Sequence, residues 1–283
     1  MLLLPELEKI SKVSRTMTNN KKGMYNEVIK EIFSNHYEEG LEHFEFTREE
    51  ISEVCSKLNI SPPKNLGDVL YSYRFRRPLP KEILDTAPSG LEWIIESVGK
   101  GKYRFTLSTR NRITPNHNLI SIKVPEATPE IITRYSSGDE QSLLTKIRYN
   151  RLIDIFLQIT AYSLQNHLRT TVKDIGQVEI DEIYVGINNN GSHFILPVQA
   201  KVGNDQLSVI QTKQDIAYCD QIFPDLICRS VSAQFMENDL IALFELTLEE
   251  SEIKVVQEKH YRIVPSKDIS EEDIRSYISR DAI

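Results

Sequence analysis

The sequence predicts an α/β protein in which a mixed sheet is flanked by helices and preceded by a mainly helical N-terminal domain. The first observation is a series of segments with apolar residues at helical spacing in the first quarter of the chain. The second is a change in the periodicity of the apolar residues later in the chain, where a long helical pattern gives way to a strand pair, a helix and a further strand. The glycine motifs of dinucleotide-binding and P-loop folds are absent from the sequence, which argues against both classes.

Residues 1–115 are predicted to form the N-terminal domain. Helices followed by a basic hairpin are typical of a winged helix, a common DNA-binding module. The alternative is a small helical domain whose exposed hairpin serves only packing. A capping box from Thr47 to Glu50 opens the second helix. The expected helices cover residues 24–36, 49–58 and 65–73, and the hairpin covers residues 91–107 with its turn at 99–102.

Basic residues are concentrated between residues 61 and 113, although the whole chain has a formal net charge of −7. That charge argues against a protein that coats nucleic acid, but one basic face is sufficient for local contact. The alternative for each of these bases is an ordinary solvated surface. The residues expected to contact DNA are Arg74, Arg76, Arg77 and Lys102 in this domain, and Arg148 and Arg151 further along the chain.

Residues 116–140 are predicted to connect the domains, because this part of the chain contains prolines and few apolar runs. Residues 141–283 then form the second domain, beginning with a long helix over 141–167. Two strands around an Asn-Gly turn predict a hairpin, and Ser270 opens a final capped helix. The hairpin strands are residues 176–186 and 193–202; a helix at 204–223 and strands at 226–235, 240–248 and 254–264 follow.

The hairpin carries polar side chains that suit a metal site. Glu179 and Asp181 are two residues apart and are expected on one face of the first strand, as are Gln199 and Lys201 on the second. Asp181, the Gln199 amide oxygen and the Ala200 carbonyl would form a hard oxygen site for Mg²⁺ or Mn²⁺. Lys201 beside that ion would orient or deprotonate an attacking water and stabilise the transition state.

Asp181 followed, after a turn, by Gln199-Ala200-Lys201 resembles the PD-(D/E)xK nuclease superfamily of restriction and repair enzymes. Those families usually carry Glu at the place of Gln199, and the Gln-x-Lys variant is similar to Mrr-like restriction endonucleases. The stretches 176–186 and 197–201 also look like an uncharacterised bacterial endonuclease family. The superfamily resemblance covers about residues 141–235.

The resemblance implies a restriction-endonuclease-like fold and a homodimeric, Mg²⁺-dependent DNA endonuclease that hydrolyses phosphodiester bonds. It implies Asp181, Gln199 and Lys201 as the catalytic residues, and it makes Gln199→Glu a change expected to keep or raise activity. Two other functions stay open. One is a non-catalytic DNA-binding protein with a degenerate nuclease core, and the other is an RNA nuclease.

Alternatives also stay open for the site itself. Asp181 and Lys201 would form a cross-strand ion pair on an exposed sheet face if no metal binds. Glu182 would replace Asp181 if the register slipped by one residue. Asp154 on the long helix is a candidate to complete the metal shell, in competition with acids such as Glu140. Gln211 and Gln214 on the next helix are candidates to bind a phosphate or a metal-bound water, or else form a solvated helix face.

The cysteines and histidines indicate the cellular compartment and whether zinc is expected. Three cysteines without metal-site or disulfide spacing fit a reducing cytoplasm. The N-terminal apolar run is too short for a signal peptide, and we expect neither a membrane span nor zinc chemistry, because the histidines are scattered.

Overall fold

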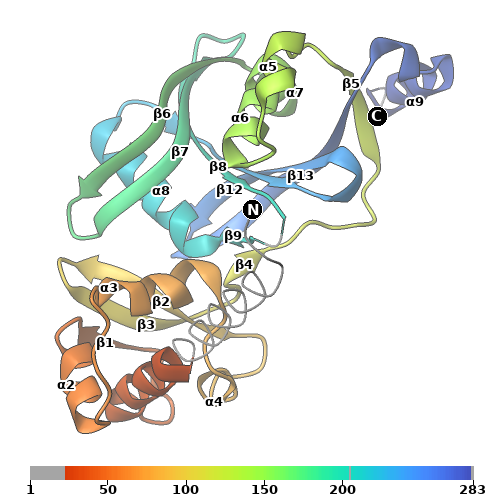
Figure 1. Ribbon diagram of the computed structural model, residues 1–283. Helices are drawn as coiled ribbons and strands as arrows, with labels where there is room; N and C mark the ends of the chain where they lie inside the picture. Colours follow the sequence, from red (N-terminus) through yellow and green to blue (C-terminus); the bar gives the residue numbers. More distant parts are fainter. Residues whose placement is uncertain (1–22, 204, 282–283) are drawn as a thin grey trace, which may run out of the picture. The chain divides into compact units, whose positions relative to one another are not determined.

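The computed structural model describes residues 23–203 and 205–281. The chain divides into two compact units, Met1–Asn111 and Arg112–Ile283. Both combine helices with strands, and the second contains a mixed sheet of eight strands, which confirms the predicted α/β class (Figure 1). No helix in the described ranges is long and apolar enough to cross a bilayer.

The first unit holds a three-stranded antiparallel sheet in the order β1-β3-β2. The expected helices and hairpin are present. The strand β1 was not predicted. Its sequence alternates exposed residues with the buried Phe44 and Phe46, and this two-residue alternation is the periodicity of a strand. The elements are a helix over residues 23–36, β1 (His43–Thr47), α2 (Glu50–Lys57), α3 (Gly67–Tyr71), a π-helix (Ser72–Arg76), α4 (Lys81–Leu84), β2 (Glu92–Gly99) and β3 (Lys102–Ser108).

Aromatic side chains fill the core of this unit. Phe33 makes edge contacts with Trp93 and Phe105 at ring-centroid distances of 5.4 and 5.1 Å. Large buried rings of this kind anchor the helices to the sheet. The predicted capping box at the start of α2 is half formed. The backbone N–H of Thr47 donates to Glu50 Oε1 at 2.7 Å, but α2 is capped at Glu49 without a side-chain hydrogen bond.

The second unit is built on the large sheet, ordered β5-β13-β12-β11-β8-β7-β6. Two neighbouring pairs in this order, β8 with β11 and β5 with β13, are parallel, and the others are antiparallel. In the large sheet β10 also pairs with β8, while β4 and β9 form a separate two-stranded sheet. The strands of the unit are β4 (Arg112–Ile113), β5 (Ser121–Pro125), β6 (Thr160–Val172), β7 (Gly176–Ile187), β8 (His193–Lys201), β9 (Leu207–Ser208), β10 (Ile227–Cys228), β11 (Ser230–Phe235), β12 (Leu240–Glu249) and β13 (Glu252–Val264).

Helices cover both faces of this sheet (Figure 1). Apolar residues of α6 and α7 pack with Leu196 and Val198 on one face, and those of α8 pack with Ile195 and Phe244 on the other. The helices are α5 (Glu130–Tyr135), α6 (Glu140–Tyr149), α7 (Leu152–Leu157), α8 (Val209–Ile222) and α9 (Glu271–Asp281).

The expected long helix over residues 141–167 is wrong beyond residue 157. Arg151 and Gln158 have φ values of 52° and 56°, which interrupt a right-handed helix, and the chain then enters β6. β6 pairs with β7 along nearly its whole length, so strand pairing overrides the helical pattern there.

The segment expected to connect the domains is partly built into the sheet. Within residues 116–140, β5 pairs in parallel with β13, and α5 follows it. The predicted hairpin of β7 and β8 is confirmed. Its turn is closed by the N–H of Gly191, which donates to the Asn188 carbonyl at 3.1 Å, and Gly191 has a φ of 79° that suits glycine.

Candidate functional site

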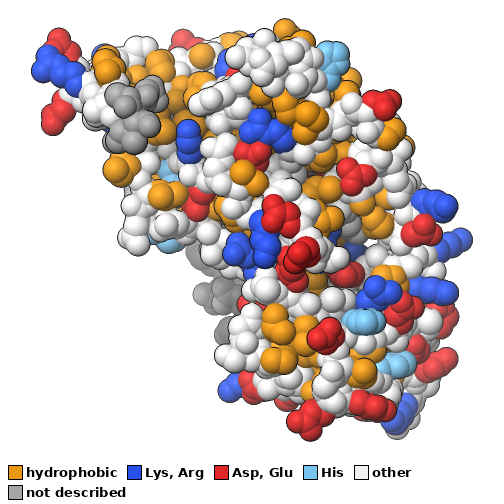
Figure 2. Space-filling model, turned by 180° about the vertical axis from the view of Figure 1, so that it is seen from behind, with side chains coloured by type: hydrophobic (Ala, Val, Ile, Leu, Met, Phe, Trp, Pro, Cys, Tyr) orange, Lys and Arg blue, Asp and Glu red, His pale blue; other side chains and the backbone are white. Residues whose placement is uncertain are grey.

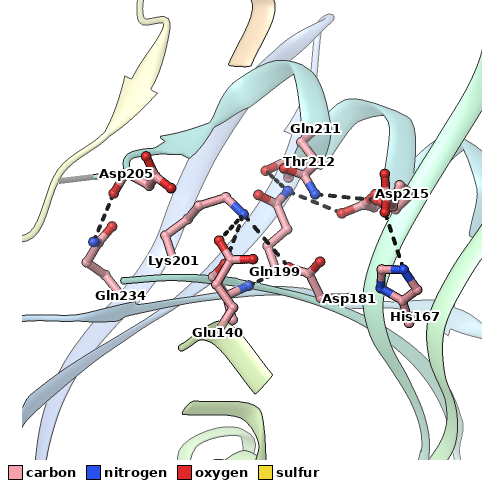
Figure 3. A network of polar contacts seen from close by, with 12 residues as sticks. Glu140, His167, Asp181, Gln199, Lys201, Asp205, Gln211, Thr212, Asp215 and Gln234 are labelled. Carbon is pink, nitrogen blue, oxygen red and sulfur yellow. Dashed lines mark hydrogen bonds and ion pairs between the residues drawn. The ribbon is translucent and has the colours of Figure 1, made fainter. Parts of the chain in front are cut away.

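The β7–β8 hairpin brings Asp181 beside the end of β8, as the sequence predicts (Figure 3). Asp181 is 8% exposed, and its Oδ2 accepts a hydrogen bond from the backbone N–H of Ala200 at 2.9 Å. This contact fixes the carboxylate against the Gln199-Ala200-Lys201 segment. The arrangement therefore lies in a buried site and differs from an ion pair on an exposed sheet face.

Lys201 is surrounded by oxygen atoms. Its Nζ donates to Glu140 Oε1 and to the Ala200 carbonyl, both at 2.9 Å, and lies 4.0 Å from Asp181 Oδ2. An ammonium group thus stands among two carboxylates and one backbone carbonyl. Oxygen donors of these types are also the ligands that hard cations prefer.

The charges in this group alter one another's ionisation. Burial lowers the pKa of Lys201, but Asp181 and Glu140 outweigh that effect and the pKa lies above its ordinary value. Burial raises the pKa of Asp181, against the opposing influence of Lys201 and the Ala200 N–H. Lys201 is therefore an ammonium near neutral pH in this arrangement. It is suited to donate hydrogen bonds rather than to take a proton from water.

Glu140 reaches the site from the first turn of α6. The Asp139 side chain caps this helix by accepting from the N–H of Ser142 at 2.9 Å, which fixes where the helix begins. Glu140 follows directly, and its side chain is 34% exposed. In the sequence, Glu140 stands out only as a competitor of Asp154, because it is the fold that brings the start of α6 to the end of β8.

Asp154 has different partners. Its Oδ1 accepts from the backbone N–H of Ala161 at 3.0 Å and from Arg151. Asp154 and Arg151 line a pocket of about 260 Å³ together with Arg148 and Tyr184. The acid that α6 and α7 supply to Lys201 is therefore Glu140.

Glu182 does not exchange places with Asp181. Its side chain is fully buried and pairs with Arg148 at 2.8 Å, while Ser163 Oγ donates to it at 2.6 Å. Val178 and Ile180 on the same strand are buried. The pairing with β6 skips residue 181, and His167 opposite has a φ of 50°, so the strand is irregular here.

Gln199 is completely buried between β8 and α8. Its Nε2 donates to Thr212 Oγ1 at 3.0 Å and to Asp215 Oδ2 at 3.2 Å. Its Oε1 is buried and has no hydrogen-bond partner among the described residues. An orphaned buried acceptor requires an explanation such as a water or a cation.

Thr212 and Asp215 are site residues that the sequence patterns do not single out. Both are fully buried, and burial followed by the charge of Asp181 raises the pKa of Asp215 well above its ordinary value. With Cys219 they follow the i, i+3, i+7 spacing of a buried helix face, which is the signal that could have found them.

The other helix and strand candidates lie around this group. Gln211 Nε2 donates to the backbone carbonyl of Glu179 at 3.3 Å. The Glu179 side chain is 43% exposed and lies 3.5 Å from His167. Gln214 is 6% exposed, which excludes a solvated position for it.

The bases expected to contact DNA differ in exposure. Arg74 is only 8% exposed, and its Nε donates to the Ile95 carbonyl at 3.2 Å, so it packs inside the first unit and does not present its charge outward. Arg76 is exposed and stacks on the ring of Tyr71 at 5.0 Å. Arg77 is half-buried over Tyr73 at 4.2 Å.

Lys102 is exposed, as is Lys100 in the same hairpin turn. In the second unit, Arg148 is engaged with Glu182, and Arg151 bonds Asp154 while its side chain stays 56% exposed. Figure 2 shows basic and acidic side chains interspersed on the face that it presents. A DNA contact on that face would therefore rest on a few bases rather than on a broad basic field.

The residues around Lys201 fit a hard divalent cation by their chemistry. Asp181, Glu140 and the Ala200 carbonyl already solvate a positive charge, and Gln199 supplies an amide oxygen without another partner among the described residues. In the same described ranges, no group of three His, Cys, Asp or Glu side chains gathers as a metal site. A cation here would depend on the amide and backbone oxygens as well as on the two acids.

Comparison with protein-family models, curated proteins and solved structures found no match for this chain.

Proposed function

We propose that the chain is a DNA endonuclease that uses Mg²⁺ or Mn²⁺ to hydrolyse phosphodiester bonds, with a restriction-endonuclease-like core. Support comes from the order α6–α7, β6, β7, β8, α8 and β11, in which one mixed sheet lies between helices. The observation that carries the proposal is the group of oxygens from Glu140, Ala200 and Asp181 around Lys201 Nζ.

Each residue of the group has a role in this proposal. Asp181, Glu140, the Ala200 carbonyl and the Gln199 amide oxygen would hold the cation. When bound, Mg²⁺ would polarise the phosphate and lower the pKa of a bound water. Lys201 would donate hydrogen bonds to the phosphate oxygens, since its raised pKa keeps it charged.

The first unit would hold the DNA in a winged-helix-like manner. Its helices, hairpin and sheet order β1-β3-β2 support that shape. The contacts would come from exposed Arg76 on the π-helix and from Lys100 and Lys102 in the hairpin turn. Cutting both strands of a duplex would require two active sites, so the proposal includes a homodimer.

A second candidate is a non-catalytic DNA-binding protein with a degenerate core. One observation in its favour is that Gln199 is uncharged, whereas the families that the chain resembles usually carry an acid at this place. Another is that Lys201 donates hydrogen bonds to oxygens that would have to hold the cation. In this second candidate, Lys201 and Glu140 form a permanent structural pair.

The test is incubation of the purified protein with supercoiled plasmid and Mg²⁺, Mn²⁺ or a chelator. The proposal expects cleavage that the chelator and Asp181→Ala both abolish. Added competitor DNA should suppress this cleavage better than competitor RNA does. Cation-independent binding without cleavage would establish the second candidate. Preferential suppression by RNA would identify an RNA nuclease.

A further inference from the structure

We infer that Thr212 and Asp215 are positioning residues that orient the Gln199 amide toward the cation, and that Asp215 determines why position 199 carries Gln. This inference rests on the proposed function, because it assigns a task to the Gln199 oxygen. Gln199 lies between these α8 residues and Lys201 (Figure 3).

The hydrogen bonds run in one direction only. Thr212 Oγ1 donates its own hydrogen to the Ser208 carbonyl at 3.2 Å, so toward Gln199 it acts as an acceptor. Asp215 Oδ2 accepts the second hydrogen of the same amide nitrogen. Both hydrogens of Gln199 Nε2 are thereby used on the α8 side.

This pattern fixes the amide orientation. Rotating the amide by half a turn would give up both bonds from Nε2 and would place Oε1 against Thr212 Oγ1, whose hydrogen is already donated to the Ser208 carbonyl. Gln199, Thr212 and Asp215 are all completely buried, so a hydrogen bond lost between them is costly. The orientation leaves Gln199 Oε1 outside the hydrogen bonds to α8 and without a partner among the described residues.

The same geometry alters the expectation for glutamate at position 199. Cation chemistry alone favours a carboxylate there, but Gln199→Glu would replace Nε2 by an oxygen 3.2 Å from Asp215 Oδ2. A glutamate carboxylate has no hydrogen to donate, so Thr212 Oγ1 and Asp215 Oδ2 would both lose the donor that Gln199 Nε2 supplies. A donor at position 215 would remove the conflict, because an amide nitrogen there would donate to the new carboxylate.

The experiment is a double-mutant cycle with Gln199→Glu, Asp215→Asn and the two together. Mn²⁺ affinity is measured by electron paramagnetic resonance, and the thermal unfolding midpoint is measured without metal. We expect Gln199→Glu alone to weaken Mn²⁺ binding about tenfold or more and to lower the midpoint, because the amide clamp is lost. The combined variant should recover most of both losses.

Two controls sharpen the test. Thr212→Val removes the hydroxyl acceptor and should weaken Mn²⁺ binding, whereas Thr212→Ser keeps it and should bind as the wild type does. Gln221→Glu makes the same change on an exposed part of α8, where the side chain contacts the Lys173 backbone, and should leave Mn²⁺ affinity unaltered.

Failure of the positioning role and failure of the proposed function give different results. If wild-type protein does not bind Mn²⁺, the proposed function and the role of the Gln199 oxygen are both overturned. If it binds Mn²⁺ but the effects of Gln199→Glu and Asp215→Asn simply add, only the positioning role of Asp215 is overturned. Equal binding by Thr212→Val and the wild type would overturn the positioning role of Thr212.

Discussion

Glu140 and Lys201, sixty-one positions apart in the sequence, are joined by a hydrogen bond of 2.9 Å between Oε1 and Nζ. This contact ties the first turn of α6 to the last residue of β8. It also means that Lys201 and a bound cation would draw on the same oxygens. The charge balance of the site therefore depends on an acid outside the Asp181 to Lys201 hairpin.

Replacing Glu140 is expected to weaken cation binding. Glu140→Gln removes one of the two carboxylates near Lys201, and fewer charged ligands lower the affinity of an oxygen site. Titration with Mn²⁺ measures the loss, which we expect to be about tenfold, or about 1.4 kcal/mol. Glu179→Gln is the matched control, because that side chain is partly exposed and lies beside His167. Equal effects of the two changes would remove Glu140 from the site.

Removing the ammonium group is expected to separate binding from chemistry. Lys201→Met keeps an unbranched side chain of similar length but removes the ammonium group. The oxygens of Glu140 and Ala200 then lose their hydrogen bonds from Lys201 and are free to bind a cation. Mn²⁺ should bind at least as tightly as to the wild type, while plasmid cleavage falls by about 100-fold or more, since a charge stabilising the transition state is gone. Cleavage at the wild-type rate would contradict the role given to Lys201.

A buried ion pair remote from the site makes the stability depend on pH. Glu245 is bound by Arg229 at 2.6 and 2.9 Å; burial pushes its pKa upward, but Arg229 and Gln257 outweigh this and lower it below 4.5. Because the pKa of Glu245 is lower in the folded state than in the unfolded state, its charge stabilises the fold at pH values above the unfolded-state pKa. This contribution is lost as the pH falls through the folded-state pKa.

Glu245→Gln should therefore reduce the free energy of unfolding at pH 7 by roughly 2 kcal/mol, because Arg229 is left without its carboxylate. The deficit should shrink as the pH falls below about 4.5, because the unfolded wild-type chain then takes up a proton at Glu245 before the folded protein does. Urea unfolding at pH 7 and at about pH 3.5 measures the difference. A deficit that is the same at both pH values would show that packing, not charge, is responsible.

The exposed bases of the first unit are expected to carry its DNA affinity. Replacing Arg76, Lys100 and Lys102 with Ala should weaken binding and reduce the salt slope by about one unit for each phosphate that is no longer neutralised. Titrations at several salt concentrations give this slope. Arg74→Ala is the contrasting variant: its side chain is buried, so we expect lower thermal stability with the slope preserved. A reduced slope for Arg74→Ala alone would reverse this assignment.

Local signals in the sequence predict the hairpin correctly. The Asn188 to Gly191 turn sets the register of β7 and β8, and this register places Asp181 beside Ala200. The break after α6 is not visible in the apolar pattern, which continues past the left-handed backbone of Arg151.

The rest of the site depends on tertiary contacts. Glu140 enters it only because α6 begins beside the end of β8. Thr212 and Asp215 are polar, and polar helix residues are normally assigned to solvent, whereas here they face a buried amide. For the same reason, the sequence suggests a surface charge at Arg74, although this side chain packs inward.

The position of Glu140 at the start of α6 has a consequence for how the protein responds to heating. Glu140 lies on the first turn of α6, and helix ends open at lower free-energy cost than the strands of a central sheet. A site that takes one acid from such a turn loses its full complement of ligands by local fraying, while the sheet beneath is still folded. Inactivation on warming is thus expected to precede global unfolding.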